Sequence, residues 1–213
     1  MKIVFTTFGS LGDVNPYIAL AKELQARGHS PSIASNGAFQ KHIEMEGIPF
    51  HCIRPDTTHL LNDTEFFRKV MDAKEGLSFL LNQLVFPSLR ESYEDTKQAI
   101  EGADVVVTSQ LTFGAHLLLE QNNTPWVSTV LAPAGFVSAH DFPVMGDMPA
   151  IKYLRHLGPG FMKVLLKQAQ KMLDSQLQPY YDFRKELGLP AGKNPLISGH
   201  HSPQKVLGMF SPL

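Results

Sequence analysis

An aspartate lies in a glycine-rich turn near the start of the chain. The stretch "FGSLGDVNP" covers residues 8–16 and separates a strand-like run, "KIVFTT", from a helix-like run, "YIALAKELQARGH". Turns of this kind usually bind anions through free backbone N–H groups, yet the carboxylate of Asp13 would repel a phosphate. Open α/β sheets bind ligands beyond the carboxyl ends of their strands, where Asp13 would lie. We therefore interpret Asp13 as a general base that accepts a proton from a bound hydroxyl group.

Helix capping is the alternative interpretation of Asp13, because aspartate is a favoured N-cap residue. The sequence favours Asn15 as the cap, since Pro16 after it suits the first helical turn. Asp13 would then lie in the turn before the helix, near its positive end, which favours the ionised carboxylate. A charged carboxylate exposed at the ligand-binding face can accept a proton, so the general base is preferred to the cap.

Other sites that bind cofactors or metals are poorly supported. Gly9 and Gly12 do not form G-x-G-x-x-G, and no acid follows the second strand until Glu44, so no nicotinamide or flavin site is predicted. No G-K-[ST] phosphate loop and no G-x-S-x-G elbow is present. The nine histidines lack the spacing of a metal site. We expect the adjacent His200 and His201 to be loop residues that face solvent.

Composition excludes several classes of protein. The 213 residues are 43% hydrophobic and 18% charged, as in soluble globular proteins. The net charge of −1, without an evident Lys/Arg cluster, argues against nucleic-acid binding. Cys52 is the only cysteine, so no intrachain disulfide forms and a reducing, cytoplasmic location is expected. No apolar run reaches the length of a membrane span or a signal-peptide core, which leaves peripheral contact with a membrane open.

Apolar, strand-like segments alternate with helix-like segments along the chain. This order predicts an α/β fold with a Rossmann-like, doubly wound parallel sheet, and the absence of a linker predicts a single domain over residues 1–213. A long helical stretch is expected to bend at Pro87, and a later one to break at Pro179. The predicted strands lie near residues 2–7, 31–35, 48–53, 104–109, 126–131 and 205–211.

The first fifty residues carry a family resemblance. "FTTFGSLGDVNPYIALAKELQARGH" resembles the amino-terminal, acceptor-side signature of GT-B glycosyltransferases, in particular the sterol-glucosyltransferase and the glycopeptide or macrolide glycosyltransferase group with a family 28-type domain. The pattern G-[ST]-x-G-D-[VT]-x-P matches from Gly9 to Pro16, and G-H matches at Gly28. Later segments also fit, so the resemblance covers the whole chain. It departs at Pro31, where the family has an aliphatic residue, and in "TSQLTFG", which lacks the Asp that assists a catalytic His in plant-type relatives.

The resemblance implies a mechanism. A UDP- or TDP-hexose would be the co-substrate, with no further cofactor and no metal, and a hexose would pass to an acceptor hydroxyl with inversion. Asp13 would take the proton of that hydroxyl, while Ser10 and Gly12 would approach the departing diphosphate. The nucleotide sugar would bind a carboxyl-terminal domain that is absent from this chain, so the chain alone is expected to be inactive.

The acceptor is expected to be an apolar small molecule such as a sterol, another lipid or a natural product. Apolar residues in segments 66–86 and 133–149 would line its site, although core packing explains them equally well. A non-catalytic small-molecule binding module of the same fold remains an alternative function, as does a subunit that needs a separate donor-binding partner. The candidate acceptor-binding residues are Phe79, Phe86, Phe113, Pro133, Phe136 and His140.

Overall fold

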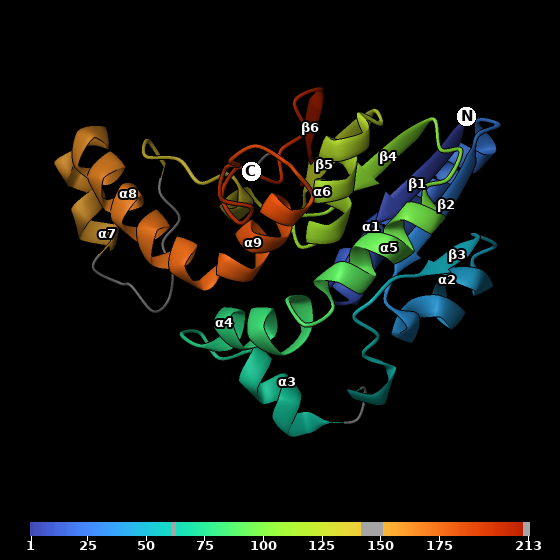
Figure 1. Ribbon diagram of the computed structural model, residues 1–213, viewed down its shortest axis with the longest axis horizontal. Coiled ribbons are helices and arrows are strands. Elements are labelled where there is room, and N and C mark those ends of the chain that lie inside the picture. Colours follow the sequence, from blue (N-terminus) through green and yellow to red (C-terminus); the bar gives the residue numbers. More distant parts are fainter. Residues whose placement is uncertain (61–62, 142–150, 211–213) are drawn as a thin grey trace.

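A single parallel sheet forms the centre of the protein. The computed structural model describes residues 1–60, 63–141 and 151–210, and its six strands pair in the order β3-β2-β1-β4-β5-β6 (Figure 1). Every pairing is parallel, which confirms the predicted fold class. The strands are β1 (Lys2–Thr6), β2 (Ser30–Ser35), β3 (Phe50–Cys52), β4 (Val105–Thr108), β5 (Trp126–Val130) and β6 (Lys205–Gly208).

Helices connect the strands and cover both faces of the sheet (Figure 1). The predicted bend at Pro87 is present, because a π-helical turn and a short turn separate α4 from α5. The predicted break near Pro179 is present too, at Leu177 between α8 and α9. The α-helices are α1 (Leu11–Ala26), α2 (Gln40–Met45), α3 (Thr64–Val70), α4 (Gly76–Leu80), α5 (Leu89–Ala99), α6 (Phe113–Asn122), α7 (Ile151–Leu154), α8 (Pro159–Gln176) and α9 (Gln178–Glu186).

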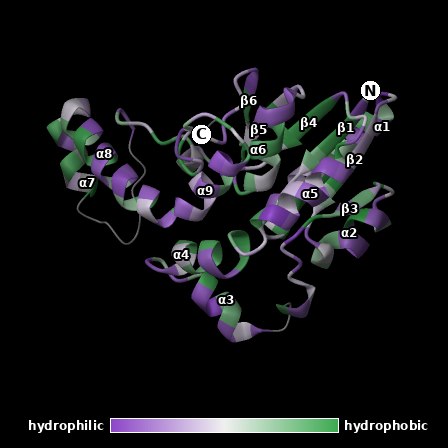
Figure 2. Ribbon diagram, viewed as in Figure 1, coloured by the Kyte–Doolittle hydropathy of each residue, from purple (hydrophilic) through white to green (hydrophobic). Residues whose placement is uncertain are grey.

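Side chains of the central strands alternate between two hydrophobic clusters. Ile3 and Phe5 of β1 belong to the cluster that contains Tyr17 of α1. Val4, between them, belongs to the cluster on the other face, which contains Leu117 of α6. Burial on both faces explains why the strands read as continuous apolar runs, as parallel strands do. Figure 2 shows this hydrophobic colouring along the central strands.

The α7–α8 helical hairpin extends away from the sheet (Figure 1). It has a small hydrophobic cluster of its own around Ile151 and Met162, which includes Ala139 from the preceding loop. Among the residues that the structure describes, no helix combines the length and the apolarity needed to span a membrane. The hairpin is therefore an appendage to the sheet with its own core.

Candidate functional site

The first turn of α1 holds the aspartate that the sequence singles out. Ser10 is the N-cap, and its Oγ accepts a hydrogen bond of 3.2 Å from the Gly12 N–H. Oδ2 of Asp13 accepts hydrogen bonds from the Ser10 N–H at 2.6 Å and from the Ser10 hydroxyl at 2.9 Å. This reciprocal arrangement is a capping box. The prediction that Asn15 caps the helix is therefore wrong, because the Ser10–Asp13 pair closes a turn that begins at Leu11.

Asp13 is a helix-capping residue with one carboxylate oxygen left over. The side chain is half-buried, and Oδ1 accepts no hydrogen bond from any residue that the structure describes. Gly9 makes room for the carboxylate, since a Cβ at this position would lie 2.2 Å from Oδ2. Its φ of 149° also favours glycine. The capping bonds thus orient the carboxylate and leave Oδ1 available to a ligand.

A cavity of about 180 Å³ lies beyond the carboxyl ends of the central strands. Asp13 lines it and follows the carboxyl end of β1, at the edge where open α/β sheets bind ligands. The turn after β1, the segment after β4 and the segment after β5 supply the rest of the wall. The lining residues are Phe8, Asp13, Ser109, Gln110, Leu111, Thr129, Val130, Leu131, Ala132 and Gly135.

Three hydroxyl groups lie in or below the wall of this cavity. The Thr129 hydroxyl donates to the Thr108 carbonyl at 2.9 Å and accepts a hydrogen bond from the Tyr17 hydroxyl. Burial, with a smaller effect of the Asp13 charge, raises the pKa of Tyr17 to about 12, so its phenol stays neutral. The buried Ser109 Oγ has no hydrogen-bond partner among the described residues. The groups buried beside Asp13 are therefore neutral hydroxyls.

Sequence reasoning did not identify Ser109, Thr129 or Tyr17 as site residues. Each is an ordinary residue in a strand, at a strand end or in a helix, and no motif marks it. The parallel register of β4 and β5, which pairs Thr108 with Ser128, places Ser109 and Thr129 at the same edge. The one sequence signal that could have found them is their position at the carboxyl ends of predicted strands.

Two of the predicted acceptor residues lie beside the cavity. Pro133 begins a short 3₁₀ turn (Pro133–Gly135) that ends at the cavity-lining Gly135. Phe136 follows, and its ring packs against the rings of His201 at 5.7 Å and Phe210 at 6.2 Å between centroids. Pro133 and Phe136 are thus well placed to extend the cavity outward.

The other predicted acceptor residues lie elsewhere. Phe113 is 1% exposed and packs in the core, with its ring centroid 6.5 Å from that of Phe86. Phe79 of α4 packs against Phe66 of α3, with the centroids 5.6 Å apart. His140 is exposed, and its backbone N–H donates to the Ser138 hydroxyl at 3.1 Å. The structure therefore does not gather the predicted aromatic residues around one pocket.

The histidine pair near the end of the chain is not solvent-facing. His200 is fully buried, with its ring centroid 4.2 Å from that of His201 and 6.4 Å from that of His116 in α6. Burial, with neighbouring imidazoles adding to it, lowers the pKa of His116 to about 3 and that of His200 to about 4. Within residues 1–60, 63–141 and 151–210, no group of three or more His, Cys, Asp or Glu side chains could hold a metal ion.

A doubly wound parallel sheet with a cavity-lining carboxylate at its strand ends defines a Rossmann-like domain. Residues 3–140 match the model of the glycosyltransferase family 28 N-terminal domain. This match covers more than half of the chain, and the chain therefore belongs to that family.

Curated relatives with similar sequences are sterol 3-beta-glucosyltransferases. The chain is 31% identical over 150 residues to that of Gibberella zeae, covering 64% of this chain and 10% of the relative. It is 35% identical over 136 residues to that of Cryptococcus neoformans, covering 62% of this chain and 8% of the relative. It is 29% identical over 194 residues to the enzyme of Debaryomyces hansenii, covering 86% of this chain and 11% of the relative. The chain thus spans about a tenth of the length of the curated relatives it matches.

Solved structures with the same fold are GT-B glycosyltransferases. The glycotransferase of kitacinnamycin aligns with a TM-score of 0.58 at 16% identity, over 97% of this chain and 45% of that one. SnogD from Streptomyces nogalater aligns with a TM-score of 0.52 at 16% identity, over 98% of this chain and 44% of that one. At these identities the similarity establishes the fold alone, which is that of the amino-terminal half of such enzymes.

Proposed function

We propose that this chain is the acceptor-binding and catalytic-base domain of an inverting glycosyltransferase that moves a hexose to a hydroxyl of an apolar acceptor. The observation that carries the proposal is the state of Asp13, whose Oδ2 is held by Ser10 while Oδ1 has no protein partner among the described residues. Membership of the family supports the reaction class. A carboxylate oriented by one oxygen and open at the other suits a general base.

The reaction would proceed in one displacement. An acceptor hydroxyl in the cavity would donate its proton to Asp13 Oδ1 as its oxygen forms a bond to the anomeric carbon. The bond from that carbon to the diphosphate of the nucleotide sugar would break on the opposite side, which inverts the configuration and leaves the electron pair on the diphosphate. The capping bonds to Ser10 would keep the carboxylate aimed during the proton transfer.

The nucleotide sugar, a UDP- or TDP-hexose, would bind mainly to a carboxyl-terminal domain, as the GT-B resemblance implies. In this structure the Ser10 N–H already donates to Asp13 and the Gly12 N–H to the Ser10 hydroxyl. Contact of this turn with the diphosphate would therefore require these bonds to be exchanged, so its contribution to donor binding would be small. The 213 residues alone are accordingly expected to have no turnover.

The relatives and the size of the cavity both bear on the acceptor, which we take to be an apolar molecule with a hydroxyl group. The relatives of similar sequence are named sterol 3-beta-glucosyltransferases. At about 180 Å³ the cavity is smaller than the roughly 300 Å³ at which small-molecule pockets begin. It would hold the hydroxyl-bearing end of a larger acceptor, whose apolar body would extend along the segment that begins at Pro133.

The test is Asp13→Asn in a two-domain enzyme that contains this chain, measured as transfer of labelled glucose from UDP-glucose to a sterol. Turnover is expected to fall about 10² to 10⁴-fold, the usual contribution of a general base. Asp63→Asn is the matched control, because Asp63 also caps a helix, with its Oδ1 accepting from the Phe66 N–H at 2.9 Å. If both variants keep wild-type turnover, Asp13 is only a cap and the alternative, a non-catalytic binding module, is favoured.

A further inference from the structure

The α7–α8 hairpin exposes apolar and aromatic side chains. Ile151 and Met162 of this hairpin are buried against partly buried leucines. Outside this cluster Tyr153 is 74% and Leu157 is 62% accessible, although large apolar side chains are usually covered. The exposed apolar residues of the hairpin are Tyr153, Leu157, Phe161, Val164 and Met172.

The same hairpin concentrates positive charge. Residues 151–173 contain five of the 19 Lys and Arg residues of the chain and none of its 20 Asp and Glu residues. Lys163, Lys167 and Lys171 follow one another at intervals of four, which places them along one side of α8. All three are exposed, and none forms a salt bridge with a residue that the structure describes. Because three other residues separate each lysine from the next, this row does not appear as a Lys/Arg cluster in the sequence.

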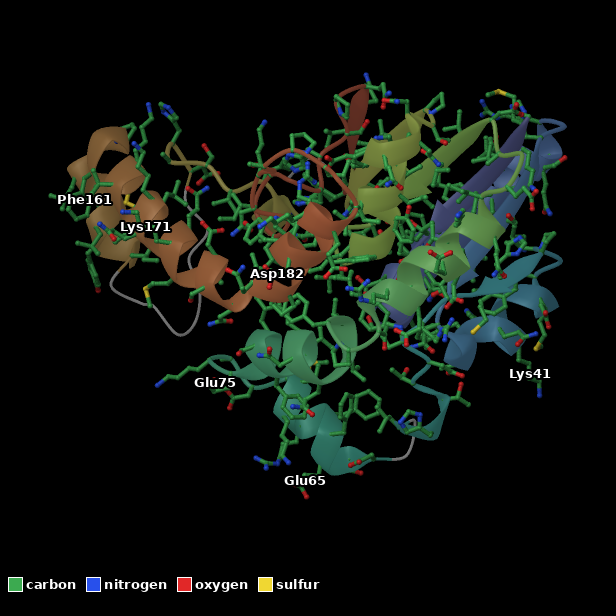
Figure 3. The ribbon with its side chains drawn as sticks, in the orientation of Figure 1. Lys41, Glu65, Glu75, Phe161, Lys171 and Asp182 are labelled. Atoms are coloured by element: carbon green, nitrogen blue, oxygen red, sulfur yellow. The ribbon has the colours of Figure 1, made fainter. Side chains whose placement is uncertain are left out.

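The lysines and the apolar residues share the exposed half of α8. At 100° per residue the three lysines occupy one flank, Phe161 and Met172 the other, and Val164 lies between. Figure 3 labels Phe161 and Lys171 on this helix, at the end of the molecule that is remote from β1 and β2. The face therefore combines a cationic border with protruding apolar side chains and stands clear of the sheet.

We infer that this face binds the surface of an anionic lipid membrane. The lysines would pair with anionic head groups, and Leu157, Phe161 and their apolar neighbours would enter the boundary with the acyl chains. A polar partner such as a nucleic acid would leave the apolar side chains in water. A second copy of this chain would bring two rows of lysines together. An anionic surface with an apolar layer beneath it complements both the lysines and the apolar side chains of the face.

This inference stands apart from the proposed transfer reaction, because it uses no residue of the Asp13 cavity. The two are nevertheless compatible. An apolar acceptor dissolves in the bilayer, and a domain held at the membrane surface would meet it there. Peripheral contact would also explain how a protein whose described helices cannot span a membrane reaches such an acceptor.

The test is co-sedimentation of the full chain with vesicles of phosphatidylcholine, alone or with about 30% phosphatidylserine. Binding is expected only with phosphatidylserine and is expected to weaken at high salt. The variant with Lys163→Gln, Lys167→Gln and Lys171→Gln is expected to lower the partition coefficient about tenfold or more. A second variant, Leu157→Ser with Phe161→Ser, keeps the charge and is expected to lose binding as well. Circular dichroism checks that both variants are folded.

The matched control removes three lysines from other parts of the surface. Lys41, Lys74 and Lys97 are exposed and lie in or near α2, α4 and α5, so Lys41→Gln, Lys74→Gln and Lys97→Gln make the same change in charge. This control is expected to bind vesicles like the wild type. Equal loss in both triple variants, or no binding to any vesicle, would overturn the inference. So would lysine-dependent binding of an oligonucleotide instead of vesicles, or dimerisation that Leu157→Ser with Phe161→Ser abolishes.

Discussion

Two polar clusters within the domain differ in how their polar atoms are satisfied. Around Asp13, the carboxylate, the Ser10 hydroxyl and the Gly12 N–H bond to one another, and Asp13 lines a cavity. Around His116, the rings are buried, and neither of its own ring nitrogens has a partner among the described residues. The first cluster is organised and open, as a ligand site should be, whereas the second is closed and costs stability.

This difference suggests that the Asp13 cluster serves function, whereas the His116 cluster affects only the stability of the fold. A hydrogen-bonded carboxylate at the start of a helix stabilises the folded protein, because capping contributes about 1 kcal/mol to its stability. A buried imidazole without partners must stay neutral, since charging it in an apolar environment is unfavourable. A titratable side chain is therefore a candidate base in the first cluster, whereas in the second cluster the titratable side chains are part of the buried core. Substitutions can test whether this division holds.

The largest expected effect is on turnover, in a two-domain enzyme that contains this chain. Asp13→Asn should lower the rate by about 10² to 10⁴-fold, or roughly 3 to 5 kcal/mol of barrier, because the amide cannot take a proton. His116→Leu should leave the rate close to that of the wild type, since this ring lies outside the cavity wall. Steady-state kinetics at neutral pH measure both. A large loss of rate in His116→Leu would break the comparison by giving the second cluster a functional role.

The next effect is on stability in acid. His116 and His200 have pKa values of about 3 and about 4 in the folded protein, below the ordinary value of 6.5. Between the folded and the unfolded pKa values the unfolded chain binds more protons than the folded protein. The free energy of unfolding is therefore highest above about pH 6.5 and falls as the pH drops. At pH 5 each residue is expected to cost about 2 kcal/mol. Thermal unfolding at pH 7 and pH 5 measures the loss.

His116→Leu is the control for that pH dependence. The substitution removes one of the two titrating groups and also a buried polar ring without partners, so at pH 7 it should be nearly neutral. At pH 5 the variant should be more stable than the wild type by about 2 kcal/mol. An unchanged pH dependence in the variant would show that His116 is accessible to protons in the folded state.

Much of this architecture was predictable from the sequence, and the exceptions have physical causes. Apolar runs such as "DVVVTS" predicted the strands because both faces of the sheet are buried. The start of α1 was misplaced because Asn15 with Pro16 is a familiar helix start, while the Ser10–Asp13 capping box begins one turn earlier. When two neighbouring residues could each cap a helix, packing with the surrounding turn selects one of them. Here the carboxylate of Asp13 packs closely against Gly9.

The site was predictable only in part. Asp13 was found because its position follows from the strand–turn–helix pattern. Ser109 ends a predicted strand but was not found, because its neighbours in the cavity depend on strand register, which one sequence does not reveal. The burial of His200 depends on packing against His116, which is distant in the chain. Phe113 was predicted to bind the acceptor, yet its side chain on α6 is buried in the core.

A smaller effect is expected from Gly9→Ala. The added Cβ would lie 2.2 Å from Asp13 Oδ2 and would displace the carboxylate, on top of a strained φ of 149°. Such strain costs about 1 to 3 kcal/mol. Gly47→Ala is the matched control, because its φ is 74° but nothing lies within 4 Å of the new Cβ. Both variants should lose stability, and Gly9→Ala alone should also lose turnover in the two-domain enzyme. Equal turnover would mean that the carboxylate does not need its capped position.

The smallest effect is expected from Ser10→Ala. The substitution removes the acceptor for the Gly12 N–H and one donor to Asp13, while the backbone N–H of residue 10 still holds Oδ2. Loss of an N-cap costs about 1 kcal/mol, so the thermal midpoint should fall slightly. Turnover should change far less than in Asp13→Asn, because the carboxylate stays charged and remains anchored by one bond. Ser10→Thr, which keeps the hydroxyl, should restore the midpoint. If Ser10→Ala instead lowered turnover as much as Asp13→Asn, the hydroxyl would take part in the reaction itself, and the cluster would contain two catalytic groups instead of one base and its cap.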